Sequence, residues 1–134
     1  MTTLAETRWL YRWASLIWAS PNTLIGLALG LPLMPFGARM CIVDGVIEIA
    51  SRHRQPGRRW PFAAITFGHV VLGTHPQELQ RLRAHERVHV RQCERWGPLF
   101  LPAYALAGAW QWVRGRDAYR DNPFEVEARR LGGE

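Results

Sequence analysis

The sequence predicts an α+β fold in which a small antiparallel sheet and several helices form one compact domain. Its 134 residues are about the length of one domain, so we treat residues 1–134 as a single unit. A hydrophobic content of 48% can supply a core, which excludes intrinsic disorder for the chain as a whole. Short β-branched runs separated by turns occupy residues 40–72, whereas the segments on either side show helical periodicity.

The N-terminal part predicts two helices separated by a kink. Residues 1–19 place apolar side chains at helical spacing. Ser-Pro-Asn at 20–22 then indicates a helix stop and restart, because serine can cap a helix and proline suits the first helical position. Pro32 and Pro35 end the second helix. The whole stretch 13–36 carries no charge, which makes it a hydrophobic helical segment.

The middle of the chain predicts the sheet. Residues 40–50 hold two β-branched runs across Asp44-Gly45, a dipeptide typical of a type I′ hairpin turn. Residues 51–60 form a basic loop, and residues 63–72 read as a third strand. Together these segments predict a small antiparallel sheet.

The C-terminal half predicts a long helix over 76–96, a second over 98–113, and a short helix opening at Asn122-Pro123. The uncharged run 96–113 is a second hydrophobic segment, so both runs are candidates for membrane association. Tryptophans near the ends of the two runs form either an interfacial belt or part of a core. They are Trp9, Trp13, Trp18, Trp110 and Trp112.

The charge favours an anionic partner. All 17 basic residues are arginine and the net charge is +6, which suits phosphate groups of lipid or nucleic acid. Because no nucleic-acid-binding motif is recognised, we expect an anionic membrane surface and no nucleic acid. Arginines precede, separate and follow the two hydrophobic segments, so the positive-inside rule places all three groups on the cytoplasmic side. This favours a surface-lying or re-entrant hairpin, or a fold that buries both segments, over simple spans.

The number of cysteines indicates the cellular compartment in which the protein is expected. Only Cys41 and Cys93 are present, and no cleavable signal peptide of the usual kind is recognised. We therefore expect a location in the cytoplasm or on the cytoplasmic face of the membrane. Cys93 is expected to be a small packed residue rather than a ligand.

The chemistry centres on His85-Glu86-Arg87-Val88-His89, an H-E-x-x-H pattern within the long predicted helix. Two imidazoles four residues apart lie one turn apart on one face, where they can bind a single Zn²⁺. Glu86 can then reach a zinc-activated water as general base.

The helical wheel places both histidines in the inward, apolar stripe. The alternative interpretation is an amphipathic basic helix whose histidines are merely buried, which leaves two imidazoles without partners at a cost in free energy. Four arginines form a ridge on the other side, which is most simply a solvated face. They are Arg83, Arg87, Arg91 and Arg95.

A catalytic zinc takes three protein ligands, so a third is required. Glu125 and Glu127 in the last predicted helix are the candidates, and they point in nearly opposite directions, so only one can serve. The helical faces do not choose between them. Glu125 is also a candidate capping partner, three residues after Asn122.

The pairing of His85-Glu86-x-x-His89 with a later helical Glu-x-x-Ala resembles the gluzincin class of zinc metallopeptidases, particularly compact bacterial and membrane-bound members. The resemblance covers residues 85–129 and implies a zincin-like active-site helix, with the third ligand at Glu125 and Ala128 matching the pattern. It also implies that an edge strand holds the peptide substrate by β-addition, a role for 63–72.

One departure from the gluzincin pattern concerns the support of a zinc-binding imidazole. Arg129 stands where the class usually has an acidic residue, so this role must pass to another carboxylate or a carbonyl. A donor opposite Glu86 is also needed to stabilise the transition state. Four residues could supply it: Tyr104, Tyr119, His69 and His75.

The leading hypothesis is a zinc metallopeptidase that hydrolyses peptide bonds in a peptide or protein substrate. Its catalytic base is Glu86, and its metal ligands are His85, His89 and Glu125. The alternatives are a non-catalytic zinc-binding scaffold, and an arginine-rich module that binds anionic lipid or nucleic acid. Zinc content and the activity of a Glu86→Gln variant distinguish these hypotheses.

Overall fold

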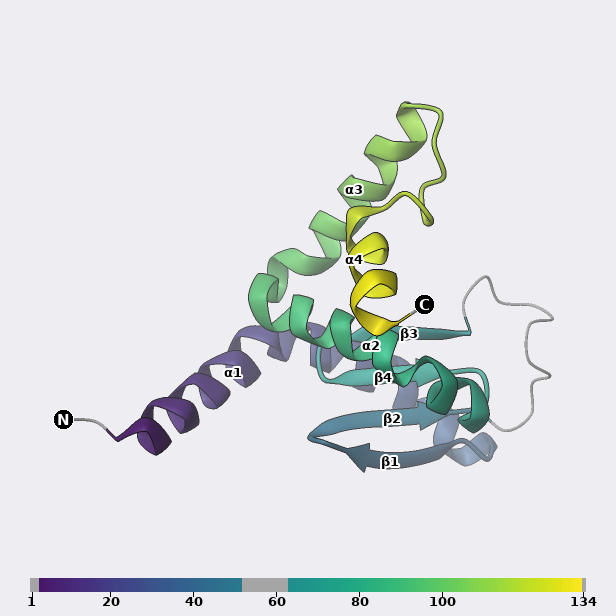
Figure 1. Cartoon of the computed structure of the whole chain (residues 1–134). Helices are drawn as coiled ribbons and strands as arrows, with labels where there is room; N and C mark the ends of the chain where they lie inside the picture. The colour runs from purple at the N-terminus through teal and green to yellow at the C-terminus, as the bar shows by residue number, and fades with distance from the viewer. Residues whose placement is uncertain (1–2, 52–62, 134) are drawn as a thin grey trace.

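The computed structural model describes residues 3–51 and 63–133, so nearly all of the predicted basic loop 51–60 lies outside the described residues. The elements in chain order are α1 (Leu4–Gly30), the 3₁₀ helix η1 (Leu31–Phe36), β1 (Arg39–Val43), β2 (Val46–Ala50), β3 (Ala64–Phe67), β4 (Val70–Gly73), α2 (Pro76–Trp96), the 3₁₀ helix η2 (Gly97–Leu99), α3 (Phe100–Val113) and α4 (Pro123–Gly132). The predicted α+β class is confirmed, and the sheet and helices are arranged as shown in Figure 1.

The sheet is mixed rather than antiparallel, in the order β1-β2-β4-β3. The expected hairpin β1–β2 is present, with Asp44 and Gly45 both at positive φ. The single strand predicted over 63–72 is wrong: these residues form the hairpin β3–β4, with Gly68 at φ 62° in its two-residue turn. Glycine adopts this conformation freely, so the turn forms inside what looked like a continuous β-branched run. β4 pairs in parallel with β2, which leaves β3 at the edge.

The predicted break at 20–22 is also wrong, because α1 runs continuously through Pro21. Proline has no N–H to donate to the carbonyl four residues earlier, which would leave Ile17 O without its helical partner. The hydroxyl of Ser20 donates to Ile17 O instead, at 2.7 Å. Asn22 is buried and donates through Nδ2 to Gly97 O at 2.7 Å, so tertiary contacts hold the helix together where local signals predicted a kink.

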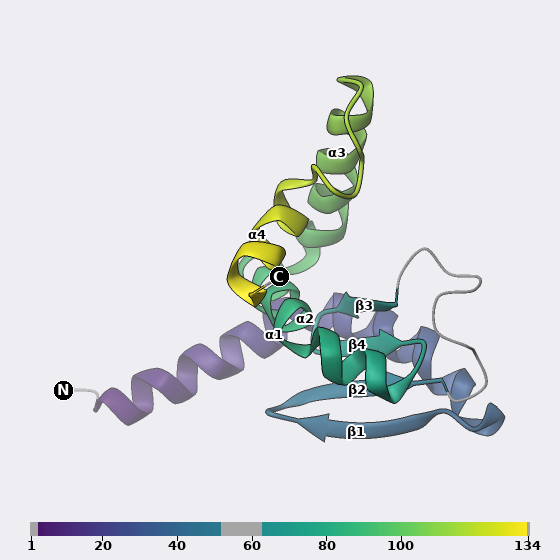
Figure 2. The ribbon, with the colours of Figure 1, turned by 45° about the vertical axis from the view of Figure 1, so that its right-hand side comes forward.

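The predicted helices of the C-terminal half are confirmed as α2, α3 and α4. The His75 ring caps α2 by accepting from Gln77 N, and the Asn122 side chain caps α4 by accepting from Phe124 N. α4 packs along α2, whereas both views show α3 pointing away from the sheet and the first half of α1 extending beyond it (Figures 1 and 2).

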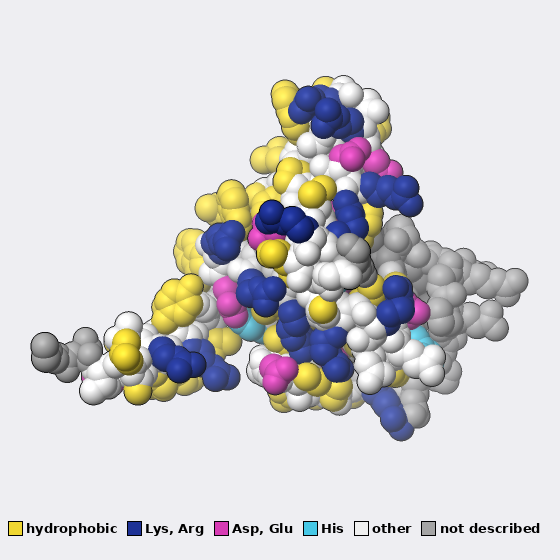
Figure 3. Space-filling model, viewed as in Figure 1, with side chains coloured by type: hydrophobic (Ala, Val, Ile, Leu, Met, Phe, Trp, Pro, Cys, Tyr) yellow, Lys and Arg dark blue, Asp and Glu magenta, His cyan; other side chains and the backbone are white. Residues whose placement is uncertain are grey.

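The two predicted hydrophobic segments differ from core helices in their exposure. Many large apolar side chains of α1 and α3 are exposed, and Figure 3 shows them along one edge of the molecule. Among the described residues, one helical stretch, Leu4–Phe36, is long and apolar enough to cross a membrane by length and composition, and an 18-residue window within it has a mean hydropathy of 1.4.

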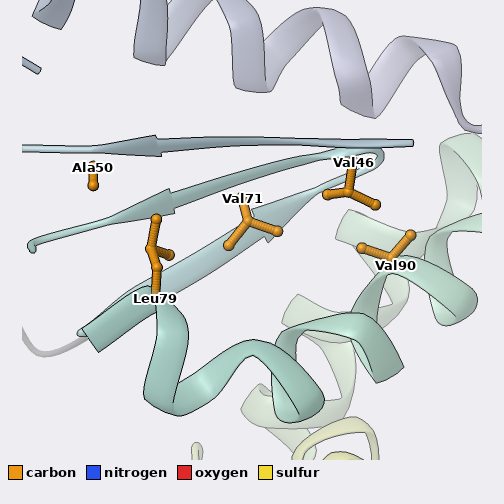
Figure 4. Packing of buried hydrophobic residues seen from close by; sticks show 5 residues of the cluster. All are labelled: Val46, Ala50, Val71, Leu79 and Val90. Carbon is orange, nitrogen blue, oxygen red and sulfur yellow. The ribbon is translucent and has the colours of Figure 1, made fainter. Parts of the chain in front are cut away.

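The core lies on both faces of the sheet. One cluster packs the sheet against α2, with α1 on the opposite side of the sheet (Figure 4). Its members are Val46, Ala50, Val71, Leu79 and Val90. A second cluster around Ile49 and Val70 packs the other face against α1. A third cluster contains Ala19, Cys93 and Phe100 at the junction of α1, α2 and α3, so Cys93 is packed as expected. Sheet and helices together hold α2 in a fixed position.

Candidate metal centre

The two histidines of the H-E-x-x-H pattern lie on the face of α2 that meets α4. His85 and His89 are both buried, and their Nε2 atoms are 3.2 Å apart. Residues four apart on an α-helix lie one above the other, which explains why the two rings converge. The helix therefore presents two imidazole nitrogens toward one point.

Glu125 supplies a carboxylate to the same point. Its Oε2 lies 3.1 Å from His85 Nε2 and its Oε1 lies 3.2 Å from His89 Nε2. The Asn122 side chain caps α4. The Glu125 carboxylate contacts His85 on α2 instead of acting as the capping partner. Glu127 is half-buried and lies outside this group.

The spacing of these atoms suits a metal ion. Ligand atoms from His85, His89 and Glu125 all lie within 4.8 Å of one another, and the closest pairs are 3.1–3.2 Å apart. Two ligands about 2.05 Å from a tetrahedral zinc lie about 3.3 Å apart. The three residues therefore have the donor types and spacing of a group that could hold a metal ion.

The electrostatics of the group are those of a buried carboxylate between two imidazoles. Burial alone would raise the pKa of Glu125, but hydrogen bonds with His85 and His89 outweigh it and lower that pKa. The hydrogen bond with Glu125 raises the pKa of His85. For His89 burial acts to lower the pKa, but Glu125 outweighs it and raises the pKa. Glu125 thus stays charged and concentrates negative potential where the rings meet.

Gln92 orients one of the two imidazoles. Its Oε1 lies 2.8 Å from His89 Nδ1, and its Nε2 donates to Phe124 O at 3.0 Å. A carbonyl oxygen only accepts, so Nδ1 of His89 carries a hydrogen, and Nε2 is the ring nitrogen that can bind a metal in place of its proton. An amide carbonyl therefore contacts His89, where the resemblance implied a carboxylate or a carbonyl. Sequence reasoning assigned Gln92 no role; its spacing of three residues from His89 was the available signal.

Glu86 lies beside the metal group without belonging to it. It is buried, and Thr66 Oγ1 of β3 donates to its Oε2 at 2.7 Å. Burial raises the pKa of Glu86, and the hydrogen bond from Thr66 only partly opposes this rise. The side chain is held in one position and has a raised affinity for a proton, which are properties of a general base. Sequence reasoning missed Thr66 because its contact with α2 depends on the β3–β4 turn.

A pocket of about 80 Å³ opens over these groups. Its wall combines β3, α2, α3 and α4, and includes Thr66, Glu86, His89, Tyr104 and Glu125.

The structure separates the four candidate donors into two pairs. The Tyr104 hydroxyl donates to Glu125 Oε1 at 2.7 Å, and Tyr119 also lines the pocket. Burial, with the charge of Glu125, raises the pKa of Tyr119 to about 12, so it keeps its proton. His69 instead binds Glu94 at 2.8 Å, and His75 caps α2. Only the two tyrosines are placed to contact a group in the pocket.

The arginine ridge is only partly a solvated face, which corrects the sequence-based interpretation. Arg83 binds both carboxylate oxygens of Glu48, at 2.9 and 3.0 Å, and Arg87 binds Glu48 Oε1 at 3.1 Å and Val43 O at 2.9 Å. Glu48 is buried on β2, so these contacts fix α2 against the sheet on the side away from the pocket. Helical periodicity alone does not reveal a buried acidic partner on a strand.

No protein-family model, no curated protein and no solved structure matches the chain.

Proposed function

We propose that the chain is a zinc-dependent metallopeptidase that hydrolyses peptide bonds. The observation that carries the proposal is the convergence of His85, His89 and Glu125 on one point, with Glu86 beside them in the same pocket. Sequence spacing supports two of these ligands, and the contact between α2 and α4 supports the third. The resemblance to gluzincins rests on the same residues.

The protein's side chains account for the proton transfers. Zinc bound to the three ligands would lower the pKa of a water molecule and polarise a peptide carbonyl. Glu86 accepts the proton of the attacking water and later passes it to the leaving amine. Its burial and the hydrogen bond from Thr66 keep it oriented for both steps.

The position of β3 supports an extended peptide as substrate. Within the described residues β3 pairs only with β4, so its other edge has backbone groups available for pairing. Ala64, Ile65 and Thr66 of β3 line the pocket beside Glu86. A peptide added along this edge would place a carbonyl over the metal group.

Metal analysis and one conservative variant test the proposal. We expect near one zinc per chain in the wild type, and loss of zinc in His85→Ala and His89→Ala. Glu125→Ala should lower zinc affinity far more than Glu127→Ala, which serves as the matched control on α4. Full zinc retention in either histidine variant would refute the site.

Glu86→Gln separates catalysis from metal binding. The variant keeps the shape of the side chain and removes its basicity, so it should fold and bind zinc while hydrolysis of a peptide library falls at least about 10²–10⁴-fold. Loss of zinc would show that Glu86 has another role. A wild type that binds zinc but cleaves no peptide, in detergent or lipid, would favour the non-catalytic scaffold.

A further inference from the structure

α1 packs on the sheet mainly through small and polar residues, together with the partly buried Leu27. Its buried positions recur every three or four residues and so lie on one face of the helix. They are Ser15, Ala19, Asn22, Gly26 and Gly30. A Cβ at Gly26 would lie 2.7 Å from Val70 Cβ, and one at Gly30 would lie 2.5 Å from Ile49 Cδ1. The backbone of α1 therefore lies directly against the sheet.

Most of the large apolar residues of α1 are exposed on its other sides. Ile17 is 68% exposed and Leu24 is 66% exposed, although both lie in the helical turns that pack on the sheet. An amphipathic helix of a water-soluble protein directs such side chains into the core. No charged residue occurs from 13 to 36, so the outward side of α1 is continuously uncharged. This polarity is the reverse of that of a soluble surface helix.

The exposed apolar surface continues onto α3. The indole of Trp18 packs against Gly97 and donates to Arg95 O at 3.3 Å, which joins α1 to the start of η2. From there, exposed side chains recur at intervals of seven, four and three residues, along one side of α3. They are Leu99, Leu106, Trp110 and Val113. We call the outward sides of α1 and α3 together the apolar face; Figure 3 shows hydrophobic side chains along this edge, from α1 to the end of α3.

Tryptophans and arginines mark the apolar face as a lipid contact. The six tryptophans among the described residues are 40–73% exposed, and all lie on α1, α3 or the end of α2. Tryptophan prefers the boundary between lipid headgroups and acyl chains. Arg114, Arg116 and Arg120 follow α3 at one end of the apolar face, whereas Arg8 and Arg12 lie on the other side of α1, in line with its buried positions. The Arg114 guanidinium lies 5.8 Å from the centre of the Trp110 ring, which keeps a cation beside an apolar side chain.

The packing of α1 indicates how it meets a bilayer. Residues 15–30 have the sheet on one side, so lipid cannot surround them. Residues 4–14 are exposed all round but extend only about 17 Å, against a hydrocarbon core of about 30 Å. Neither half can cross a bilayer while the fold is intact. The helix can instead lie in the plane of the interface with its apolar side inserted.

We propose that the apolar face anchors the protein to an anionic phospholipid bilayer, with α1 lying in the plane of the interface. Arg114, Arg116 and Arg120 pair with headgroup phosphates, and the apolar side chains of α1 and α3 enter the acyl region. This anchor stands on residues outside the candidate metal centre, so it is independent of the proposed activity.

Flotation of the full-length protein with vesicles tests the anchor. We expect it to float with vesicles of phosphatidylcholine and phosphatidylglycerol, and much less with phosphatidylcholine alone. The double variant Ile17→Ser/Leu24→Ser should bind at least about tenfold more weakly. Ile42→Ser/Val126→Ser is the matched control, because Ile42 and Val126 are exposed apolar residues outside the apolar face. Equal loss in both double variants, or no loss in either, would overturn the assignment.

Two further measurements keep the proposal testable in the wild-type protein. Brominated acyl chains should quench tryptophan fluorescence, and alkaline carbonate should release the bound protein. Retention in carbonate would overturn the in-plane arrangement. A dimer in sedimentation that does not bind anionic vesicles would show that a second copy covers the apolar face.

Discussion

Gln92 should control the zinc affinity of a site in which it is not a ligand. It is buried and accepts a hydrogen bond from His89 Nδ1 while donating to Phe124 O. Replacement by leucine keeps a side chain of similar size but removes the acceptor. With zinc bound, His89 Nε2 must be unprotonated, so the hydrogen stays on a buried Nδ1 without a partner. In the metal-free variant the hydrogen can move to Nε2. The free-energy cost of an unpaired Nδ1–H therefore arises only when zinc is bound, and it lowers the zinc affinity.

The magnitude follows from that unsatisfied group. A buried donor without an acceptor costs about 1–3 kcal/mol. This corresponds to an affinity loss of about 5- to 150-fold, in the range expected when a partner of a metal-binding imidazole is lost. Competition with a chromophoric chelator at fixed pH measures the zinc affinity of Gln92→Leu, and far-UV circular dichroism checks that the variant is folded.

A second variant separates affinity from stability. Gln92→Glu keeps an acceptor for His89 but loses the donation to Phe124 O, so zinc affinity should match or exceed that of the wild type while the free energy of unfolding falls. Glu127→Gln serves as the control on α4. A folded Gln92→Leu that binds zinc within about twofold of the wild type would refute the assigned role of the amide carbonyl.

Two other variants probe the supports of α2. Glu48→Ala removes the buried partner of Arg83 and Arg87 and should lower the free energy of unfolding by about 3 kcal/mol, measured by urea denaturation; a loss below about 1 kcal/mol would show that the pair contributes little. Thr66→Val removes the hydrogen bond that holds down the pKa of Glu86, so that pKa should rise further and Glu86 should stay protonated to higher pH. The acid limb of the kcat/KM profile should then move to higher pH, and an unchanged limb would contradict the role of Thr66.

The helices of the C-terminal half could be predicted because their signals are local. The period of α2 and the Asn122-Pro123 start of α4 are visible in a few consecutive residues. The errors occurred where distant contacts decide the structure. Pro21 stays inside α1, where Ser20 donates to Ile17 O and the buried Asn22 binds Gly97 O, and the strand that follows the turn at Gly68 pairs in parallel with the distant β2.

The residues of the candidate site also divide into those that a local pattern predicts and those that depend on tertiary contacts. His85, Glu86 and His89 follow from a five-residue pattern, whereas the face of α4 left Glu125 and Glu127 open until the resemblance favoured the first. The roles of Thr66 and Gln92 depend on where β3 and α4 meet α2, which no local pattern encodes. The metal chemistry itself stays a prediction.

The proposed ligands come from two separate helices, which makes metal capture and helix docking one event. Gln92 already joins the imidazole of His89 to the backbone of α4. A bound ion would add a second link between α2 and α4, through His85, His89 and Glu125. Zinc at a hundred times its dissociation constant would stabilise the docked form by about 2.7 kcal/mol. Withdrawal of zinc would therefore loosen α4 first, while the cluster between α2 and the sheet stays closed. Because α4 supplies part of the pocket wall, the shape of the pocket would then depend on bound zinc.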